Sequence, residues 1–265
     1  MLNWLRQLWG GPEARGRAIP DTLWEATLAA YPFLAERPAT ERQQLRTMAG
    51  EFLAQKEFSG AHGLPVSDDM AVAIAAQACL PVLHLGLAWY NDFVGIVVHP
   101  GEMLARREMQ DASGVVHRYS EVLVGEAMDR GPVTLSWQDV ASAGEQAGQG
   151  YNVVIHEFVH KMDMKNGVAD GCPPLGSRAA RAAWQAVMQT AYDAFCEQVT
   201  IAERFGGQAP WLDAYGATSP AEFFAVTCEA YFVNRDRFTQ DFSALTLLFD
   251  KFFQHTTAFA QYARQ

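Results

Sequence analysis

The sequence is poor in cysteine, with 4 cysteines among 265 residues and no C-x-x-C pair. Cysteines that are scattered in this way indicate neither a disulfide framework nor a cysteine-based zinc site. We expect them to be small buried hydrophobic residues in a reducing compartment. They are Cys79, Cys172, Cys196 and Cys228.

Basic residues are also scarce, since 20 Lys and Arg face 30 Asp and Glu, for a formal net charge of −10. Without a Lys/Arg stripe to neutralise phosphates, direct binding of nucleic acid is excluded. No apolar run approaches the ~20 residues of a membrane span. The segment Met1–Trp9 lacks the long apolar stretch and cleavage site of a secretory signal. We therefore expect a cytoplasmic chain.

Internal repeats and low-complexity tracts are absent, while 49% of the residues are hydrophobic, enough for a sizeable core. A glycine- and proline-containing linker ends near Pro20. We predict an N-terminal segment and linker over residues 1–20, followed by one domain over residues 21–265.

Hydrophobic periodicity and turn residues predict a mostly helical α+β fold with a small mixed sheet. We expect strands at about 94–99, 115–124 and 133–137. Helices are expected at about 21–31, 40–57, 67–80, 151–162, 177–204, 222–233 and 242–262.

The most informative motif is His156-Glu157-Phe158-Val159-His160, which spells H-E-x-x-H, the zinc signature of metallopeptidases. Residues four apart on a helix are about 40° apart around the axis and roughly 6 Å apart along it. Both imidazoles can therefore reach one Zn²⁺, and Glu157 would take a proton from a zinc-bound water. Chance predicts only roughly 0.01 occurrences of this pattern at this composition.

The helix that carries the motif is apolar around most of its circumference. Burying two histidines and a glutamate there is costly unless other groups satisfy them. A hydrogen-bonded pair of core histidines is the alternative to a zinc site, and we favour zinc.

A third ligand is needed, because zinc in hydrolases takes three protein ligands and keeps one position open. Asp163 stands where a metzincin would continue its motif with glycine, and the next histidine is His255. The best candidate is Glu222, in the first turn of a second apolar helix that Ser219 and Pro220 begin. The same spacing is also a capping box, with Glu222 folded back onto Ser219, and the residues alone leave both interpretations open.

Several motifs in order, from about residue 20 to 255, resemble the Mlc titration factor A family of bacterial zinc peptidases. These are gluzincin-type enzymes similar to the metalloprotease domain of anthrax lethal factor. The motifs are His156–Asp163, Asn166-Gly167, Asp213–Tyr215, Pro220–Val226, Leu80–Leu83, Leu85–Trp89 and Gly131–Trp137.

The resemblance implies a zincin-like metallopeptidase domain with one Zn²⁺ bound by His156, His160 and Glu222. It implies catalytic roles for Glu157, which activates the water, and for Tyr215, seven residues before Glu222. The implied activity is aminopeptidase-like, on short or unstructured peptides. The implied partner is an Mlc-like transcriptional repressor, through which the family controls sugar uptake.

Two further carboxylates lie near the proposed ligands. Glu229 follows Glu222 by seven residues, so both fall on nearly the same helix face. It is a candidate third ligand or, as we prefer, an acceptor for a histidine N–H. Asp163 is a similar candidate, although a surface ion pair with Lys161 or Lys165 fits equally well.

In zincins the peptide substrate extends a sheet by pairing with an edge strand. Our candidate for that edge is the strand over residues 133–137, and an interior strand is the alternative.

Two functions remain open. The protein is either a zinc peptidase that also regulates sugar uptake, or a protein that sequesters a repressor with peptidase activity secondary. The presence of both Glu157 and Tyr215 favours the first, because a pure binding module needs no general base beside the histidines.

Overall fold

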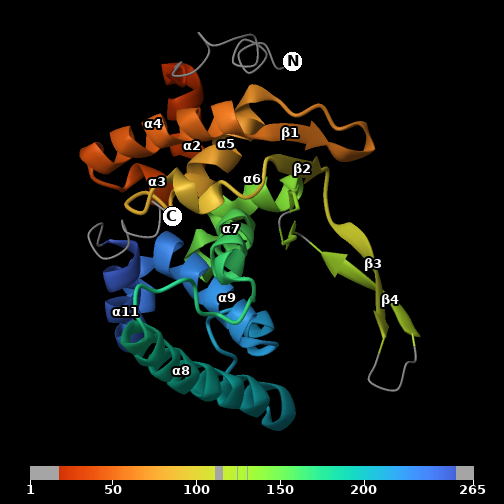
Figure 1. The fold of residues 1–265 in the computed structure, drawn as a ribbon, viewed down its shortest axis with the longest axis vertical. Coiled ribbons are helices and arrows are strands. Elements are labelled where there is room, and N and C mark those ends of the chain that lie inside the picture. Colours follow the sequence, from red (N-terminus) through yellow and green to blue (C-terminus); the bar gives the residue numbers. More distant parts are fainter. Residues whose placement is uncertain (1–17, 111–115, 124, 130, 255–265) are drawn as a thin grey trace.

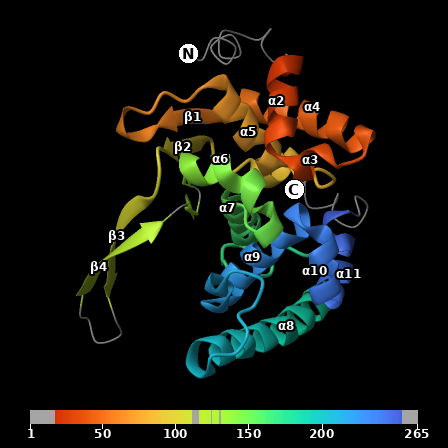
Figure 2. The ribbon, with the colours of Figure 1, turned by 180° about the vertical axis from the view of Figure 1, so that it is seen from behind.

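The computed structural model describes residues 18–110, 116–123, 125–129 and 131–254, and of residues 103–110 and 116–123 it gives the backbone only. The N-terminal helices form one end of the molecule, and the long helix α8 (Arg178–Phe205) lies at the opposite end (Figure 1). Between them lie α7 (Val153–Asp163) and α9 (Pro220–Val233). Figure 2 shows the same order from behind.

The N-terminal layer consists of α2 (Asp21–Ala30), the short α3 (Pro32–Ala35), α4 (Ala39–Gln55) and α5 (Asp68–Cys79). Helix α5 begins where Ser67 accepts a hydrogen bond from the Met70 amide, with two aspartates in its first turn. From Met70 to Cys79 every residue of α5 is buried. A helix that is apolar all round belongs in a core, and α5 is that element here.

Four short strands form the main sheet in the order β1–β2–β6–β5. The first three, β1 (Glu57–Gly60), β2 (Gly95–His99) and β6 (Val133–Ser136), are parallel, whereas β5 (Gly125–Ala127) runs antiparallel to β6. The sheet is therefore mixed and lies upstream of α7 in sequence, as predicted.

A separate antiparallel hairpin of β3 (Met103–Gln110) and β4 (Val116–Leu123) extends from one side of the molecule in both views.

The prediction that residues 133–137 form the edge strand is wrong. Strand β6 pairs with β2 on one side and β5 on the other, so it is interior. The edge on this side is β5, whose three residues are too few for a visible alternation pattern. Trp137 is not part of the strand but begins α6 (Trp137–Gln146), because the Ser136 hydroxyl caps that helix by accepting from the Asp139 amide.

Most predicted elements agree with the structure to within a few residues. The helix expected at 40–57 ends at Gln55, so that Glu57 can enter β1. The helix expected at 242–262 is α11 (Ser243–Phe253), and the predicted remainder beyond residue 254 lies outside the described residues, as do the ends of the strand expected at 115–124. Strands β1, β3 and β5 and helices α3, α6 and α10 (Arg235–Asp241) were not predicted.

An aromatic cluster joins the C-terminal helices to α8. Trp184 of α8 lies 5.3–5.7 Å, ring centroid to ring centroid, from Phe224, Phe249 and Phe252. Because aromatic pairs at such spacings add to the free energy gained by area burial, this cluster fixes α9 from the side away from the sheet. Within the described residues no helix is long and apolar enough to cross a membrane.

Lys56, between α4 and β1, is a buried cation. Its Nζ donates to the backbone oxygens of Tyr90 and Phe93 at 2.5 and 2.6 Å and lies 4.1 Å from the centroid of the Phe93 ring. Burial lowers the pKa of Lys56 from 10.5 to about 8. The neutral amine still has two donors for its two acceptors, so the contact survives deprotonation.

We expect the stability that Lys56 contributes to rise with pH. Between pH 8 and 10.5 the unfolded chain holds a proton on this residue that the folded protein has lost, so the free energy of unfolding increases with pH. Urea unfolding of the wild type and of Lys56→Met at several pH values measures this. The advantage of the wild type should grow from pH 7 to pH 10, and a constant or shrinking difference would contradict the lowered pKa.

Candidate metal centre

Helix α7 carries both histidines of the motif. Its N-terminus is fixed by Asn152, whose side-chain oxygen accepts from the Ile155 amide at 2.9 Å. The apolar residues of the helix are fully buried, and Phe158 packs at 5.0 Å, centroid to centroid, on Tyr90. With that side committed to the core, the 3.6-residue period turns His156 and His160 together toward α9.

Helix α9 begins at the capping motif that the sequence predicts. The Ser219 hydroxyl accepts from the Glu222 amide at 3.2 Å, and Pro220 is the first helical residue. The Glu222 carboxylate, however, lies against the two histidines. One half of the capping box is therefore present, since Ser219 caps the Glu222 amide. The Glu222 side chain contacts the two histidines and not the Ser219 amide.

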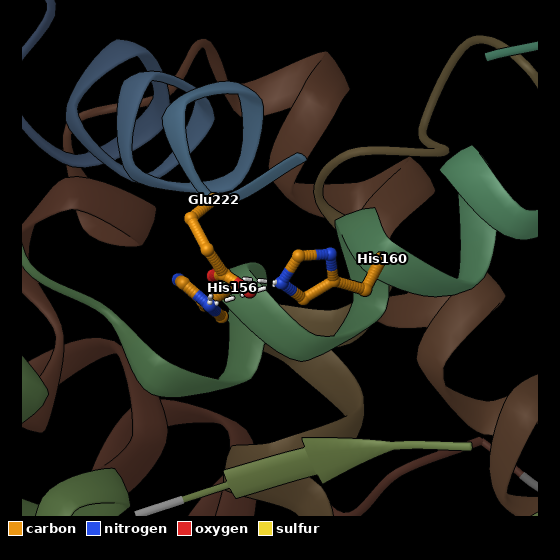
Figure 3. A group of neighbouring side chains, drawn as sticks. All are labelled: His156, His160 and Glu222. Carbon is orange, nitrogen blue, oxygen red and sulfur yellow. Dashed lines mark hydrogen bonds and ion pairs between the residues drawn. The ribbon is translucent and has the colours of Figure 1, made fainter. Parts of the chain in front are cut away.

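Three side-chain atoms from the two helices meet at one point (Figure 3). Glu222 Oε2 lies 3.0 Å from His156 Nε2 and 3.1 Å from His160 Nε2, and the two Nε2 atoms are 3.1 Å apart. The structure therefore brings together the three residues predicted as ligands, which form the one potential metal-binding group of three or more such side chains among the described residues.

This triangle fits a zinc ion. Ligand atoms at about 2.0–2.1 Å from a tetrahedral zinc stand about 3.3–3.4 Å apart, close to the spacing here. Two imidazole nitrogens and one carboxylate oxygen are also the donor set of catalytic zinc sites that leave a fourth position open. The residues present could therefore hold zinc after a small outward shift of the three ligand atoms.

Glu229 orients the first histidine. Its Oε1 lies 2.7 Å from His156 Nδ1, and its Oε2 accepts from the backbone amide of Asn152 at 2.5 Å. With Nδ1 as the donor to Glu229, Nε2 is the nitrogen that faces the triangle, and it could offer its lone pair to a metal ion in place of its proton. Glu229 thus contacts the Nδ1 atom of a predicted ligand and adds no atom of its own to the triangle, in agreement with the preferred interpretation of the sequence.

The charges of the cluster compensate one another. Burial alone would lower the pKa of His156, but Glu229 and Glu222 raise it well above its ordinary value. Burial would raise the pKa of Glu222, but hydrogen bonds from both histidines hold it well below its usual range. A metal ion would replace the shared proton as the positive charge between these groups.

Glu157 lies on the next face of α7, toward β5. Its side chain is 5% exposed and contacts strand β5 at Gly125, where an added Cβ would stand 2.5 Å from Oε1. Burial raises the pKa of Glu157 to about 6, and the two histidines act in the opposite direction. Glycine is required at position 125 for the carboxylate to lie there.

A cavity of about 510 Å³ opens over the cluster. Its lining includes Glu157 and the three triangle residues, with β5 on one side and the segment before α9 on the other. Glu126 and Asp213 add two carboxylates, and none of its described lining residues is Lys or Arg.

Tyr215 belongs to the 3₁₀ turn η6 (Ala214–Ala217) and lines the same cavity. Its side chain is 44% exposed, and its ring centroid is 6.3 Å from that of His156. The turn is held from behind, because Tyr192 of α8 donates to the Ala217 oxygen at 3.0 Å.

Asp163 is buried, but its contact is with a loop. Its Oδ2 accepts from the Gly171 amide at 2.7 Å, and Trp184 donates to the Gly171 oxygen at 2.8 Å. The surface ion pair considered from the sequence is wrong, since Lys165 pairs with Asp92 at 2.8 Å. Asp163 therefore links the end of α7 to the loop that packs on the start of α9.

Three contributors were not identified from the sequence: Asn152, Gly125 and Lys161. Their roles depend on partners 30 or more residues away, namely Glu229 for Asn152, Glu157 for Gly125 and the turn after β5 for Lys161. Two of them carry a local signal, since Asn152 precedes an apolar helix as a capping residue and Gly125 is a glycine in a short strand.

Comparison with known proteins places the chain among metallo-peptidases. Residues 3–254 match the family described as glucose-regulated metallo-peptidase M90. Among curated relatives, Mlc titration factor A of Klebsiella pneumoniae is 34% identical over 247 residues, which cover 93% of this chain and 90% of the relative. The protein of the same name from Serratia proteamaculans is 35% identical over 87% and 86% of the two chains. The one from Salmonella arizonae is 33% identical over 96% and 97%.

The contact between His156 and Glu229 predicts a loss of metal affinity in Glu229→Gln. A glutamine has one acceptor for two donors, so either His156 Nδ1 or the Asn152 amide loses its partner. We expect zinc to bind about 10- to 100-fold more weakly, as is usual when a partner of a metal-bound histidine is removed. Competition with a chromogenic chelator measures the affinity.

Glu203→Gln is the matched control, because Glu203 is exposed on α8. It removes the same charge from the molecule and should leave the affinity unchanged. Equal affinities for the two variants would show that Glu229 does not orient the ligand.

Proposed function

Since the chain belongs to the glucose-regulated metallo-peptidase M90 family, we propose that it is a zinc-dependent peptidase with a zincin-like fold. The single observation that carries this proposal is the triangle of His156, His160 and Glu222, which lies beside Glu157 under an open cavity. A binding surface alone would need neither a preformed set of three ligands nor a buried carboxylate next to it.

The chemistry divides between the ion and the side chains. When bound, zinc would act as a Lewis acid that lowers the pKa of a water and polarises the scissile carbonyl. Glu157, one residue from His156 on the cavity wall, would take the proton of that water and later deliver it to the leaving amine. Its position against Gly125 directs the carboxylate along the wall where a substrate would lie.

Tyr215 is the proposed donor to the oxyanion of the transition state. A phenol is neutral at pH 7 and can donate to an oxygen that becomes negative only during the reaction. Support comes from its place on the cavity wall beside His156 and from the anchoring of its turn by Tyr192.

Strand β5 is the proposed binding edge for the peptide backbone, in place of β6. Along an antiparallel pair of strands, one pair of opposed residues exchanges backbone hydrogen bonds, and the next pair directs its N–H and C=O groups away from the partner strand. Met128 donates to the Pro132 oxygen and Glu126 opposes Thr134, so these two positions face β6. Gly125 and Ala127 consequently direct their N–H and C=O groups outward, where a peptide can pair with them.

Aminopeptidase-like specificity is supported by the charge of the cavity. Glu126 and Asp213 line it without belonging to the ligand triangle, and its described lining contains no Lys or Arg. Such a cavity favours a positively charged group on the substrate, and the free α-ammonium group of a peptide supplies one.

A second function follows from the relatives, which are named for the titration of Mlc. We propose that this chain also binds a glucose-regulated repressor of the Mlc type, in the cytoplasm where such a repressor acts. The two functions are separable, because repressor binding does not require Glu157 to act as a base.

Glu157→Gln tests the catalytic proposal. The amide keeps the size of the side chain and leaves the ligand triangle intact, but it cannot accept a proton. We expect zinc content equal to the wild type and hydrolysis of short peptides slower by on the order of 10²- to 10⁴-fold. Elemental analysis and an amine-release assay give the two quantities.

Normal hydrolysis by metal-replete Glu157→Gln would exclude Glu157 as the base. Binding of a purified Mlc repressor to the same variant separates the two functions. If the wild type and Glu157→Gln both bind the repressor and neither hydrolyses peptides, the protein sequesters a repressor and is not a peptidase.

N-terminal acetylation of the substrate tests the aminopeptidase proposal. Removing the positive charge should lower kcat/KM for a short peptide by on the order of tenfold or more, because one charge-assisted contact is lost. The measurement compares one peptide with a free and an acetylated N-terminus. Equal rates would leave a peptidase in place but contradict recognition of a free N-terminus.

A further inference from the structure

Lys161 is a buried cation that the proposed chemistry does not use. It follows His160 on α7 and is 1% exposed. Its Nζ donates to the backbone oxygens of Met128 at 2.5 Å and Gly131 at 3.0 Å, and lies 4.6 Å from the centroid of the Phe93 ring. Burying an ammonium group is costly. A buried lysine whose hydrogen-bond partners are neutral backbone oxygens is therefore expected to fix the position of those oxygens.

The two acceptors belong to the turn that joins β5 to β6. Met128 directly follows the last residue of β5, and the Gly131 amide donates to the Met128 oxygen at 3.1 Å, which closes the turn. The ammonium group therefore fixes one end of β5 to the helix that carries the histidines.

The other end of β5 meets the same helix at Glu157. Gly125 lies so close to that carboxylate that a Cβ would stand 2.6 Å from the Cγ atom of Glu157. Glu157 and Lys161 are four residues apart, so they share one face of α7. Two side chains of one helix face thus contact the first residue of a three-residue strand and the turn that directly follows its last residue.

We propose that Lys161 is a positioning residue for the substrate: it holds β5 so that the outward-facing groups of Gly125 and Ala127 stand in a fixed register with Glu157. A peptide that pairs with β5 then brings its scissile bond to the carboxylate and the ligand triangle. This inference rests on the proposed peptidase function. It assigns a role to a residue that contacts neither metal nor substrate.

The proposal predicts that Lys161→Met weakens the hydrolysis of extended substrates but not that of very short ones. Two substrates separate this role from a general structural one: a pentapeptide long enough to pair with β5, and an amino-acid anilide with a single scissile amide. For the pentapeptide we expect KM to rise by on the order of tenfold, because two hydrogen bonds from a charged donor no longer fix the strand. For the anilide, KM and kcat should stay within about twofold, and zinc content should be unchanged.

Lys165→Met is the matched control. Lys165 is the next lysine along the chain, but it pairs with Asp92 across a partly exposed contact. Both substrates should be hydrolysed normally by this variant. If Lys161→Met does not fold, Lys161→Gln serves in the same comparison, since its neutral amide still offers N–H donors to the turn.

If Lys161→Met impairs the hydrolysis of both substrates equally, or leaves the KM for the pentapeptide unchanged, the positioning role is wrong. Either result would leave the proposed peptidase function intact. A metal-replete wild type that hydrolyses neither substrate would overturn the peptidase and this inference with it.

Discussion

The contact between His156 and Glu229 is the interaction on which the rest of the site depends. A histidine at the centre of a buried helix pair needs a partner for each ring nitrogen. Glu229 takes Nδ1 and thereby directs Nε2 to Glu222 and His160. Because Glu229 also accepts from the Asn152 amide, the residue that caps α7 is tied to α9. The start of one helix and the middle of the other are thus fixed by one carboxylate.

The mutual compensation of these charges also explains why a polar cluster is compatible with such an apolar surrounding. Every residue of α9 is buried except Pro220 and Glu222, which both lie in its first turn. Separately, the carboxylates and histidines would be costly to bury, whereas together each supplies the hydrogen-bond partner of another. A divalent cation fits this balance, since it can take the place of a proton among the same ligand atoms.

The sequence was most informative where chemistry and local pattern coincide. The H-E-x-x-H spacing predicted the histidine pair, and the Ser219 cap predicted the helix that carries Glu222. Neither pattern determined which way the Glu222 side chain turns, and only the resemblance to a family favoured the histidines. Most long helices were predicted because their apolar periodicity is local.

What the sequence did not reveal depends on pairing across the chain. Strand β5 has three residues, and its edge position is defined by β6, which pairs with it only after an intervening turn. The prediction of β6 as the edge failed for this reason: a short strand on its outer side carries no alternation to recognise. Gly125 and Lys161 were overlooked likewise, because each contacts residues that are distant in sequence, and the same holds for the contact of the Asn152 amide with Glu229.

Helix α7 connects these observations, because its eleven residues contact three different parts of the structure. One side packs Phe158 among the rings of Phe52, Tyr90 and Phe93. The side with His156 and His160 faces α9 and forms the ligand triangle. The side with Glu157 and Lys161 faces β5. Since a helix is rigid over three turns, the aromatic contacts that seat α7 in the core also set the separation between the ligands and the strand edge. Precision at the site is therefore a consequence of packing on the opposite side of the same helix.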